Sequence, residues 1–142
     1  MRRPYLWTFA RERAGDRCEY CRMPRIGGVE FQLEHIRPKQ HRGADDESNI
    51  AFTCARCNLV KGPNAAGFDP LTDELTRLYD PRTDEWSEHF GFDGVVVVGR
   101  TAVGRTTVDL LRMNSDGRVA RRQALSDLGY QFGPRVGKSG SP

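Results

Sequence analysis

The alternation of apolar and polar positions predicts a helix and two strands in the first half of the chain. Residues 5–14 place Leu, Phe and Ala at helical spacing with arginines between them, and a glycine follows as a stop. Residues 31–33 alternate between apolar and polar, which favours a strand ending near Pro38. The polar residues 39–48 predict a surface loop, and the apolar residues 49–53 predict a second strand.

The second half is expected to form an extension built from strands and helices. The expected elements are a short helix over 58–61, an extended segment over 63–84 with a helical turn at 73–78, a hairpin over 86–98, and helices over 101–113 and 116–128. These patterns predict an α+β fold with one domain over 1–132, its core at about 5–62 and a C-terminal α/β extension at about 63–132 packed on that core. The Gly/Pro/Ser-rich residues 133–142 are expected to be disordered.

Length and charge then narrow the class of protein. The chain has 142 residues, and its longest apolar run, Val95 to Val98, is far below the roughly 20 residues of a membrane span. The N-terminal arginines precede no apolar segment, so we expect no secretory signal and a cytoplasmic location without a membrane partner. The net charge is +3, and its positive excess lies in residues 1–62.

All four cysteines stand in two matched pairs, Cys18-x-x-Cys21 and Cys54-x-x-Cys57. Two such turns suit a structural Zn²⁺ held by four thiolates. The alternatives are four free thiols or a redox dithiol. The chain lacks the βαβ pattern of a thioredoxin-like site, so the spacing favours zinc.

The residues between and after the cysteine pairs carry a second pattern. Glu34-His35 precedes Pro38, a glycine-bearing loop follows, Asn49 comes next, and the second cysteine pair continues as Asn58-x-x-Lys61. This order resembles the HNH endonucleases with cysteine knuckles. Residues 63–132 also resemble the tail of small bacterial members of that family. The resemblance implies a ββα-metal (His-Me finger) module stapled by the four-cysteine zinc site.

The resemblance assigns four catalytic residues: His35, Asn49, Asn58 and Glu34. His35 would be the general base that activates water, because imidazole titrates near neutral pH. Glu34 and Asn58 would hold a catalytic Mg²⁺, or Mn²⁺ or Ni²⁺, through oxygen atoms. Asn49 would brace the loop by hydrogen bonds from its side chain to the backbone, and a backbone carbonyl or another side chain should orient the second nitrogen of His35.

The sequence departs from the commoner family pattern at three positions. Glu34 replaces Asp, Arg42-Gly43 replaces Gly-Gly, and Asn58 replaces His. The departures at Glu34 and Arg42, together with a tail of unassigned purpose, keep open a second function: a non-catalytic zinc module that binds nucleic acid or a protein. A third function that stays open is redox sensing by the cysteines.

Five cationic residues flank the expected cleft and are the candidate contacts to DNA phosphates: Arg37, Lys39, Arg42, Arg56 and Lys61. Their alternative role is a solvated surface of mixed charge. The expected partner is double-stranded DNA, including structured or modified DNA, cut or nicked with weak sequence specificity. The sequence leaves the oligomeric state open, with a homodimer as one option.

Overall fold

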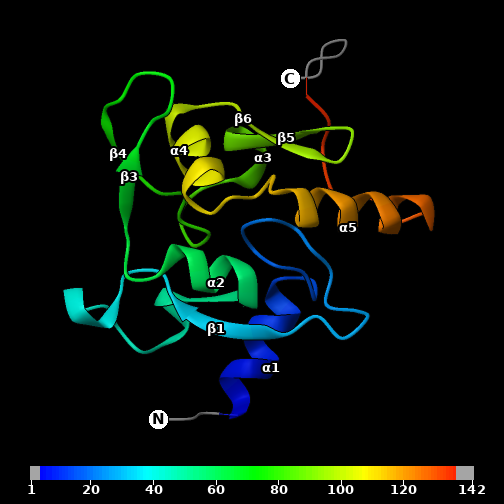
Figure 1. Cartoon of the computed structure of the whole chain (residues 1–142). Helices are drawn as coiled ribbons and strands as arrows, with labels where there is room; N and C mark the ends of the chain where they lie inside the picture. The colour runs from blue at the N-terminus through cyan, green and yellow to red at the C-terminus, as the bar shows by residue number, and fades with distance from the viewer. Residues whose placement is uncertain (1–3, 137–142) are drawn as a thin grey trace. The chain divides into compact units, whose positions relative to one another are not determined.

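A computed structural model describes residues 4–136 of the chain, and it divides into two compact units (Figure 1). The first unit contains the chain up to Ala65 together with Asp80–Thr83. The second unit contains Ala66–Tyr79 and the chain from Asp84 onward. The predicted core, residues 5–62, therefore lies within the first unit. None of the described helices combines the length and apolar character needed to cross a lipid bilayer.

The first unit contains the predicted helix and both predicted strands. Its elements are α1 (Pro4–Arg13), β1 (Phe31–His35), the 3₁₀ turns η1 (Lys39–His41) and η2 (Glu47–Asn49), β2 (Ile50–Cys54) and α2 (Ala55–Lys61). β1 and β2 pair in antiparallel fashion, from Phe31 opposite Cys54 to His35 opposite Ile50. Figure 1 shows α2 on one side of this hairpin and α1 on the other. The two strands and the following helix thus form one β-β-α sequence.

Aromatic side chains form the core between α1 and the hairpin. The fully buried Phe52 ring lies 5.1 Å from the Trp7 ring, edge to face, and 4.8 Å from the Phe31 ring, stacked. Such aromatic pairs add favourable electrostatics to the burial of apolar area. Arg13, in the last turn of α1, donates hydrogen bonds to the carbonyl oxygens of Glu47 and Ile50. Packing and these bonds together fix α1 against the start of β2.

The second unit confirms the predicted hairpin and the last two helices. Its elements are β3 (Ala66–Phe68), β4 (Leu75–Arg77), α3 (Trp86–His89), β5 (Phe90–Asp93), β6 (Val96–Gly99), α4 (Ala102–Leu110) and α5 (Asp116–Asp127). β3 pairs with β4 and β5 with β6, each pair antiparallel.

Three segments of the second unit differ from the prediction. The first is Trp86–His89, which forms helix α3 where the hairpin was expected to begin, and Phe90 N donates to Trp86 O at the end of this helix. The helical turn expected at 73–78 is instead strand β4, because Asp69 accepts hydrogen bonds from Leu71 N and the Thr72 hydroxyl and builds a turn. The segment expected to be disordered begins with ordered residues, since Phe92 exchanges backbone hydrogen bonds with Pro134 O and Val136 N. Residues 137–142 of that predicted tail lie outside the described residues.

A buried ion pair joins the β3–β4 hairpin to α4. The Asp69 side chain, with no exposed surface, accepts two hydrogen bonds from Arg105, at 3.0 Å from Nε and 2.8 Å from Nη2. These bonds, with that from Leu71 N, lower the pKa of Asp69 from 3.8 to about 2. The folded state therefore releases this proton more readily than the unfolded chain.

We predict that this ion pair makes the second unit acid-labile. Its stabilisation is fully present above about pH 4 and is lost as the pH falls through about 2, because only the unfolded chain protonates Asp69 in that interval. Asp69→Asn should remove this dependence and lower stability at neutral pH. Urea unfolding followed by Trp86 fluorescence in a Trp7→Phe background measures it. Asp73→Asn is the control, because it neutralises an exposed carboxylate of the same hairpin; equal acid sensitivity of the Asp69 and Asp73 variants would contradict the assignment.

Candidate active site and metal centre

The two cysteine pairs converge in the first unit. Cys18, Cys21, Cys54 and Cys57 are buried, form no disulfide, and place their sulfur atoms within 4.8 Å of one another. Cys54 is the residue that caps the start of α2, and its Sγ accepts a hydrogen bond from Cys57 N, just as Cys18 Sγ accepts one from Cys21 N. Each Cys-x-x-Cys turn thus presents its sulfurs in the same way.

This cluster fits a tetrahedral metal ion. The Cys21 and Cys54 sulfurs are 3.7 Å apart, and a tetrahedron with Zn–S bonds of about 2.3 Å has S···S edges of about 3.8 Å. Burial raises the pKa of the Cys18 and Cys57 thiols. Four buried thiolates therefore need a cation, and Zn²⁺ suits a set of four sulfur ligands. The geometry supports the predicted metal-binding role of the cysteines.

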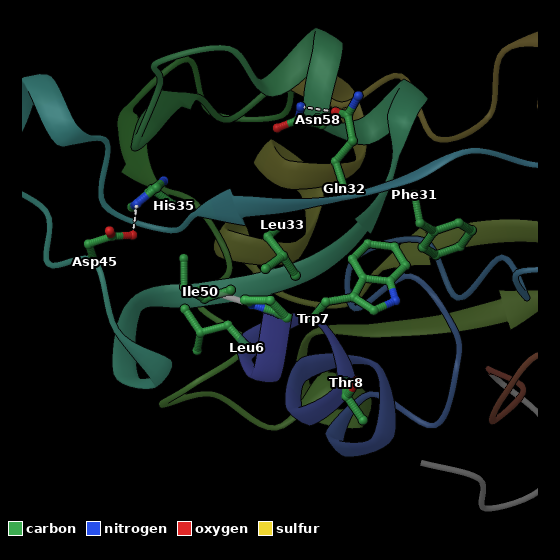
Figure 2. A pocket seen from close by; sticks show the side chains of 11 residues that line it. Leu6, Trp7, Thr8, Phe31, Gln32, Leu33, His35, Asp45, Ile50 and Asn58 are labelled. Atoms are coloured by element: carbon green, nitrogen blue, oxygen red, sulfur yellow. Dashed lines mark hydrogen bonds and ion pairs between the residues drawn. The ribbon is translucent and has the colours of Figure 1, made fainter. Parts of the chain in front are cut away.

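His35 ends β1 and faces an aspartate of the following loop. Its Nε2 lies 3.0 Å from Asp45 Oδ1, and the His35 side chain is 23% exposed (Figure 2). Because a carboxylate only accepts hydrogen bonds, Nε2 is the donor in this contact. The sequence predicts that a backbone carbonyl or a side chain orients one nitrogen of His35 but does not identify it, and in the structure this partner is the Asp45 side chain. No sequence signal distinguishes it from its neighbours Asp46 and Glu47.

Asn49 holds the loop between β1 and β2 closed. Its Oδ1 accepts a hydrogen bond from Arg37 N at 2.8 Å, and its Nδ2 donates to Arg37 O at 3.0 Å and to Ala44 O at 2.8 Å. These are the side-chain-to-backbone bonds expected of this residue. They join the residue two positions after His35 to the residue immediately before Asp45.

Backbone geometry in the same loop explains the pair Arg42-Gly43. A Cβ atom on Gly43 would lie 1.7 Å from Arg37 O and 2.8 Å from Asn49 Nδ2, so a side chain there would break the loop. Arg42 has φ +65°, the left-handed conformation that glycine adopts most readily. Arg42 therefore adopts a backbone conformation that favours glycine, at the position where the commoner pattern has its first glycine.

Glu34 lies on the other face of β1 from His35, because successive strand residues point in opposite directions. Its carboxylate pairs with Lys61 Nζ at 2.6 Å and accepts a hydrogen bond from the Tyr20 hydroxyl at 3.3 Å. Burial raises the pKa of Glu34, and the Lys61 ammonium acts in the opposite direction. Lys61 also donates to Ile36 O at 3.1 Å. The structure thus brings Glu34 and Lys61 together in the interior.

This placement differs from the expectation for both residues. Lys61 is 1% exposed, so its ammonium group neutralises Glu34 and is not presented to a phosphate. Glu34 is 5% exposed and already holds two partners, so it is not presented to a metal ion on the face of His35. One feature of the sequence could have indicated this separation. Successive residues of a strand point to opposite faces, so the side chains at positions 34 and 35 are expected on different faces of β1.

Asn58 lies on α2, where its Nδ2 donates a hydrogen bond to Gln32 Oε1. Both residues line a pocket of about 860 Å³ beside β1, and His35 and Asp45 line the same pocket. Figure 2 shows the His35–Asp45 pair and the Gln32–Asn58 pair at separate places on its wall, with Trp7 of α1 below β1. His35 and Asn58 thus share one pocket while keeping different partners.

The remaining basic candidates lie on the surface of the first unit. Arg37, Lys39 and Arg42 are exposed in the loop after β1, and Arg56 is exposed in the first turn of α2. Their exposed guanidinium and ammonium groups are accessible to phosphates. Lys61 alone of the five candidates is buried.

Comparisons with known proteins agree with the site. Residues 18–64 match the family model for HNH endonuclease. The chain is 26% identical over 126 residues to the Septu protein PtuB of Bacillus thuringiensis. The match covers 87% of this chain and 46% of that relative, so the chain spans about half of the relative's length. No solved structure matches the chain.

We predict that Cys54→Ser removes the metal and unfolds the first unit, because a structural zinc site contributes folding free energy directly. Zinc per chain, measured by elemental analysis, should fall from one to near zero. Circular dichroism should then show a loss of ordered structure. Wild type treated with a strong chelator is the matched comparison and should behave alike. A zinc-free Cys54→Ser protein with the melting temperature of wild type would contradict this prediction.

The Glu34–Lys61 pair yields a second stability prediction. Lys61→Met leaves a buried carboxylate without its counter-ion and should cost about 3–5 kcal/mol of unfolding free energy. Adding Glu34→Gln should recover much of this loss, since no buried charge then remains. Lys39→Met, at an exposed position, is the control and should change stability by less than about 0.5 kcal/mol. Urea unfolding measures all four proteins; equal stabilities of the two lysine variants would overturn the assignment.

Proposed function

We propose that this chain, in which residues 18–64 form a domain of the HNH endonuclease family, is a metal-dependent nuclease that hydrolyses DNA phosphodiester bonds. The observation that carries the proposal is the position of His35. Within the family-matched segment, this imidazole ends β1, remains partly exposed and lines a pocket. A general base needs such access to water and substrate.

In this proposal, His35 takes a proton from the attacking water. Because Nε2 donates to Asp45, Nδ1 is the atom that accepts this proton. The water oxygen forms a bond to phosphorus as the bond from phosphorus to the leaving oxygen breaks. The leaving oxygen takes a proton from solvent, and the imidazolium returns its own proton to solvent.

Asn58 is the residue that we assign to a hard divalent cation, Mg²⁺, Mn²⁺ or Ni²⁺. Its Nδ2 donates to Gln32, so its Oδ1 is the atom with the chemistry of a ligand for such an ion. A bound cation would neutralise charge developing on the phosphate and on the leaving oxygen. Glu34 could join it only by breaking its ion pair with Lys61, so we assign Glu34 a structural role.

Arg37, Lys39, Arg42 and Arg56 are the residues that we assign to the DNA backbone. Their exposed charges support binding that weakens with salt and carries little sequence information. Double-stranded DNA is the partner we propose. The similarity to PtuB further supports the proposal that this chain acts, like that relative, as a Septu protein.

One observation favours a second candidate function. The buried Glu34–Lys61 pair removes a carboxylate that the family resemblance assigns to the metal. A module with this change retains the cysteine cluster, the braced loop and the basic surface. The second candidate is therefore a non-catalytic zinc-stabilised module that binds nucleic acid or a protein.

We predict that the purified, zinc-loaded protein converts supercoiled plasmid to nicked or linear forms in Mg²⁺, Mn²⁺ or Ni²⁺ and not in EDTA. His35→Ala should lower the rate by about 10²–10⁴-fold, the usual contribution of general acid–base catalysis. His41→Ala, an exposed histidine of the next loop, is the matched control and should retain the wild-type rate. Unchanged zinc content confirms that each variant is folded.

Two results would count against the nuclease. Cleavage by His35→Ala at the wild-type rate would exclude His35 as the base. Absence of cleavage by folded wild type in every metal, together with salt-dependent binding to DNA, would favour the binding module instead.

A further inference from the structure

We infer that Asp45 is a positioning residue for His35, and that Asn49 acts on the reaction through Asp45 by holding the loop between them closed. This inference rests on the proposed function, in which His35 is the base. The geometry that carries it is the 3.0 Å contact from His35 Nε2 to Asp45 Oδ1 and the three hydrogen bonds of Asn49.

The contact selects one tautomer of His35. A neutral imidazole carries its proton on either nitrogen, and the partner of one nitrogen decides which. The Asp45 carboxylate only accepts, so it keeps the proton on Nε2 and leaves Nδ1 as the lone-pair nitrogen. It also holds the ring plane, because rotation of the ring would break the contact.

Asp45 needs a means of being held in place, because it belongs to a loop rather than to β1 or β2. Asn49 supplies it. One Asn49 amide binds both Arg37, two residues after His35, and Ala44 O, one residue before Asp45. Asn49 also immediately precedes Ile50, the strand partner of His35. The chain from His35 to Asp45 is thus tied at both ends to one buried side chain.

Gly43 makes this closure sterically possible. The chain turns so tightly at this position that a Cβ atom would overlap Arg37 O and approach Asn49 Nδ2. The carboxylate in contact with the His35 ring is that of Asp45, whereas Glu34, at the adjacent position of β1, points to the opposite face of the strand and pairs with Lys61. Asp45 is therefore the carboxylate that remains to orient the imidazole.

The first arm of the test reads the tautomer and needs no enzymatic activity. In protein labelled with ¹⁵N-histidine, long-range ¹H–¹⁵N spectra at neutral pH should show the Nε2–H form for His35. The chain has only three histidines, which simplifies assignment. Asp45→Ala and Asn49→Asp should both lose this pattern, whereas Asp46→Asn, which removes a charge from the next residue, should keep it. His89 reports on folding of the second unit, and the zinc content of each variant reports on folding of the first unit, which holds the cysteine cluster.

The second arm measures cleavage of supercoiled plasmid. Asp45→Ala should lower kcat by about 10²-fold with KM nearly unchanged, because the base is misplaced while the DNA contacts remain. If Asn49 acts through Asp45, the Asp45→Ala/Asn49→Asp double variant should lose little more than either single variant. Asp46→Asn should match wild type.

The two arms separate failure of this inference from failure of the proposed function. A wild-type His35 tautomer in folded Asp45→Ala, or wild-type kcat in that variant, would overturn the role of Asp45. Multiplicative losses in the double variant would overturn the link through Asn49. If wild type cuts no DNA yet shows the Nε2–H form that depends on Asp45 and Asn49, the positioning device stands and the nuclease assignment fails.

Discussion

The convergence of four buried sulfur atoms is the constraint on which the first unit depends. Residues 18–21 and 54–57 are separated by more than thirty positions, yet their sulfurs lie within 4.8 Å of one another. This meeting closes a loop that contains β1, the Asn49-braced segment and β2. Burial of thiols without a cation is unfavourable for their charged form, so metal binding and closure of this loop are coupled. The position of His35 at the end of β1 follows from that closure.

Local patterns made much of this fold predictable. The helix over the first residues, the two strands, the later hairpin and the last two helices follow from apolar periodicity together with the glycine and proline signals that bound it. The cysteine cluster follows from two matched Cys-x-x-Cys turns, and the loop-bracing bonds of Asn49 follow from its place in an ordered motif. In each case the determining residues are close in sequence or belong to a recognisable spacing.

Partnerships between distant charged residues were not predictable in the same way. Asp45 is one of three consecutive acidic residues, and only the loop conformation selects it as the partner of His35. Lys61 looked like a surface cation, and only the packing of α2 against β1 buries it beside Glu34. In the second unit, Arg122 is fully buried and donates to Val95 O and Met113 O, although its sequence context is a cluster of arginines on a polar helix. The sequence specifies the charge of each residue, but tertiary packing determines which group that residue pairs with.

The return of Asp80–Thr83 to the first unit has a topological consequence. The family match ends at residue 64, but Arg82 forms an ion pair with Glu19 and donates to Ile50 O, the carbonyl that Arg13 also binds. The chain therefore passes between the two units three times, and no single cut releases the first unit with all its contacts. The segment defined by family resemblance and the segment that folds as one body are different objects. The β3–β4 hairpin is inserted between two segments of a discontinuous first unit, and this unit is complete only after the chain returns to it at Asp80–Thr83.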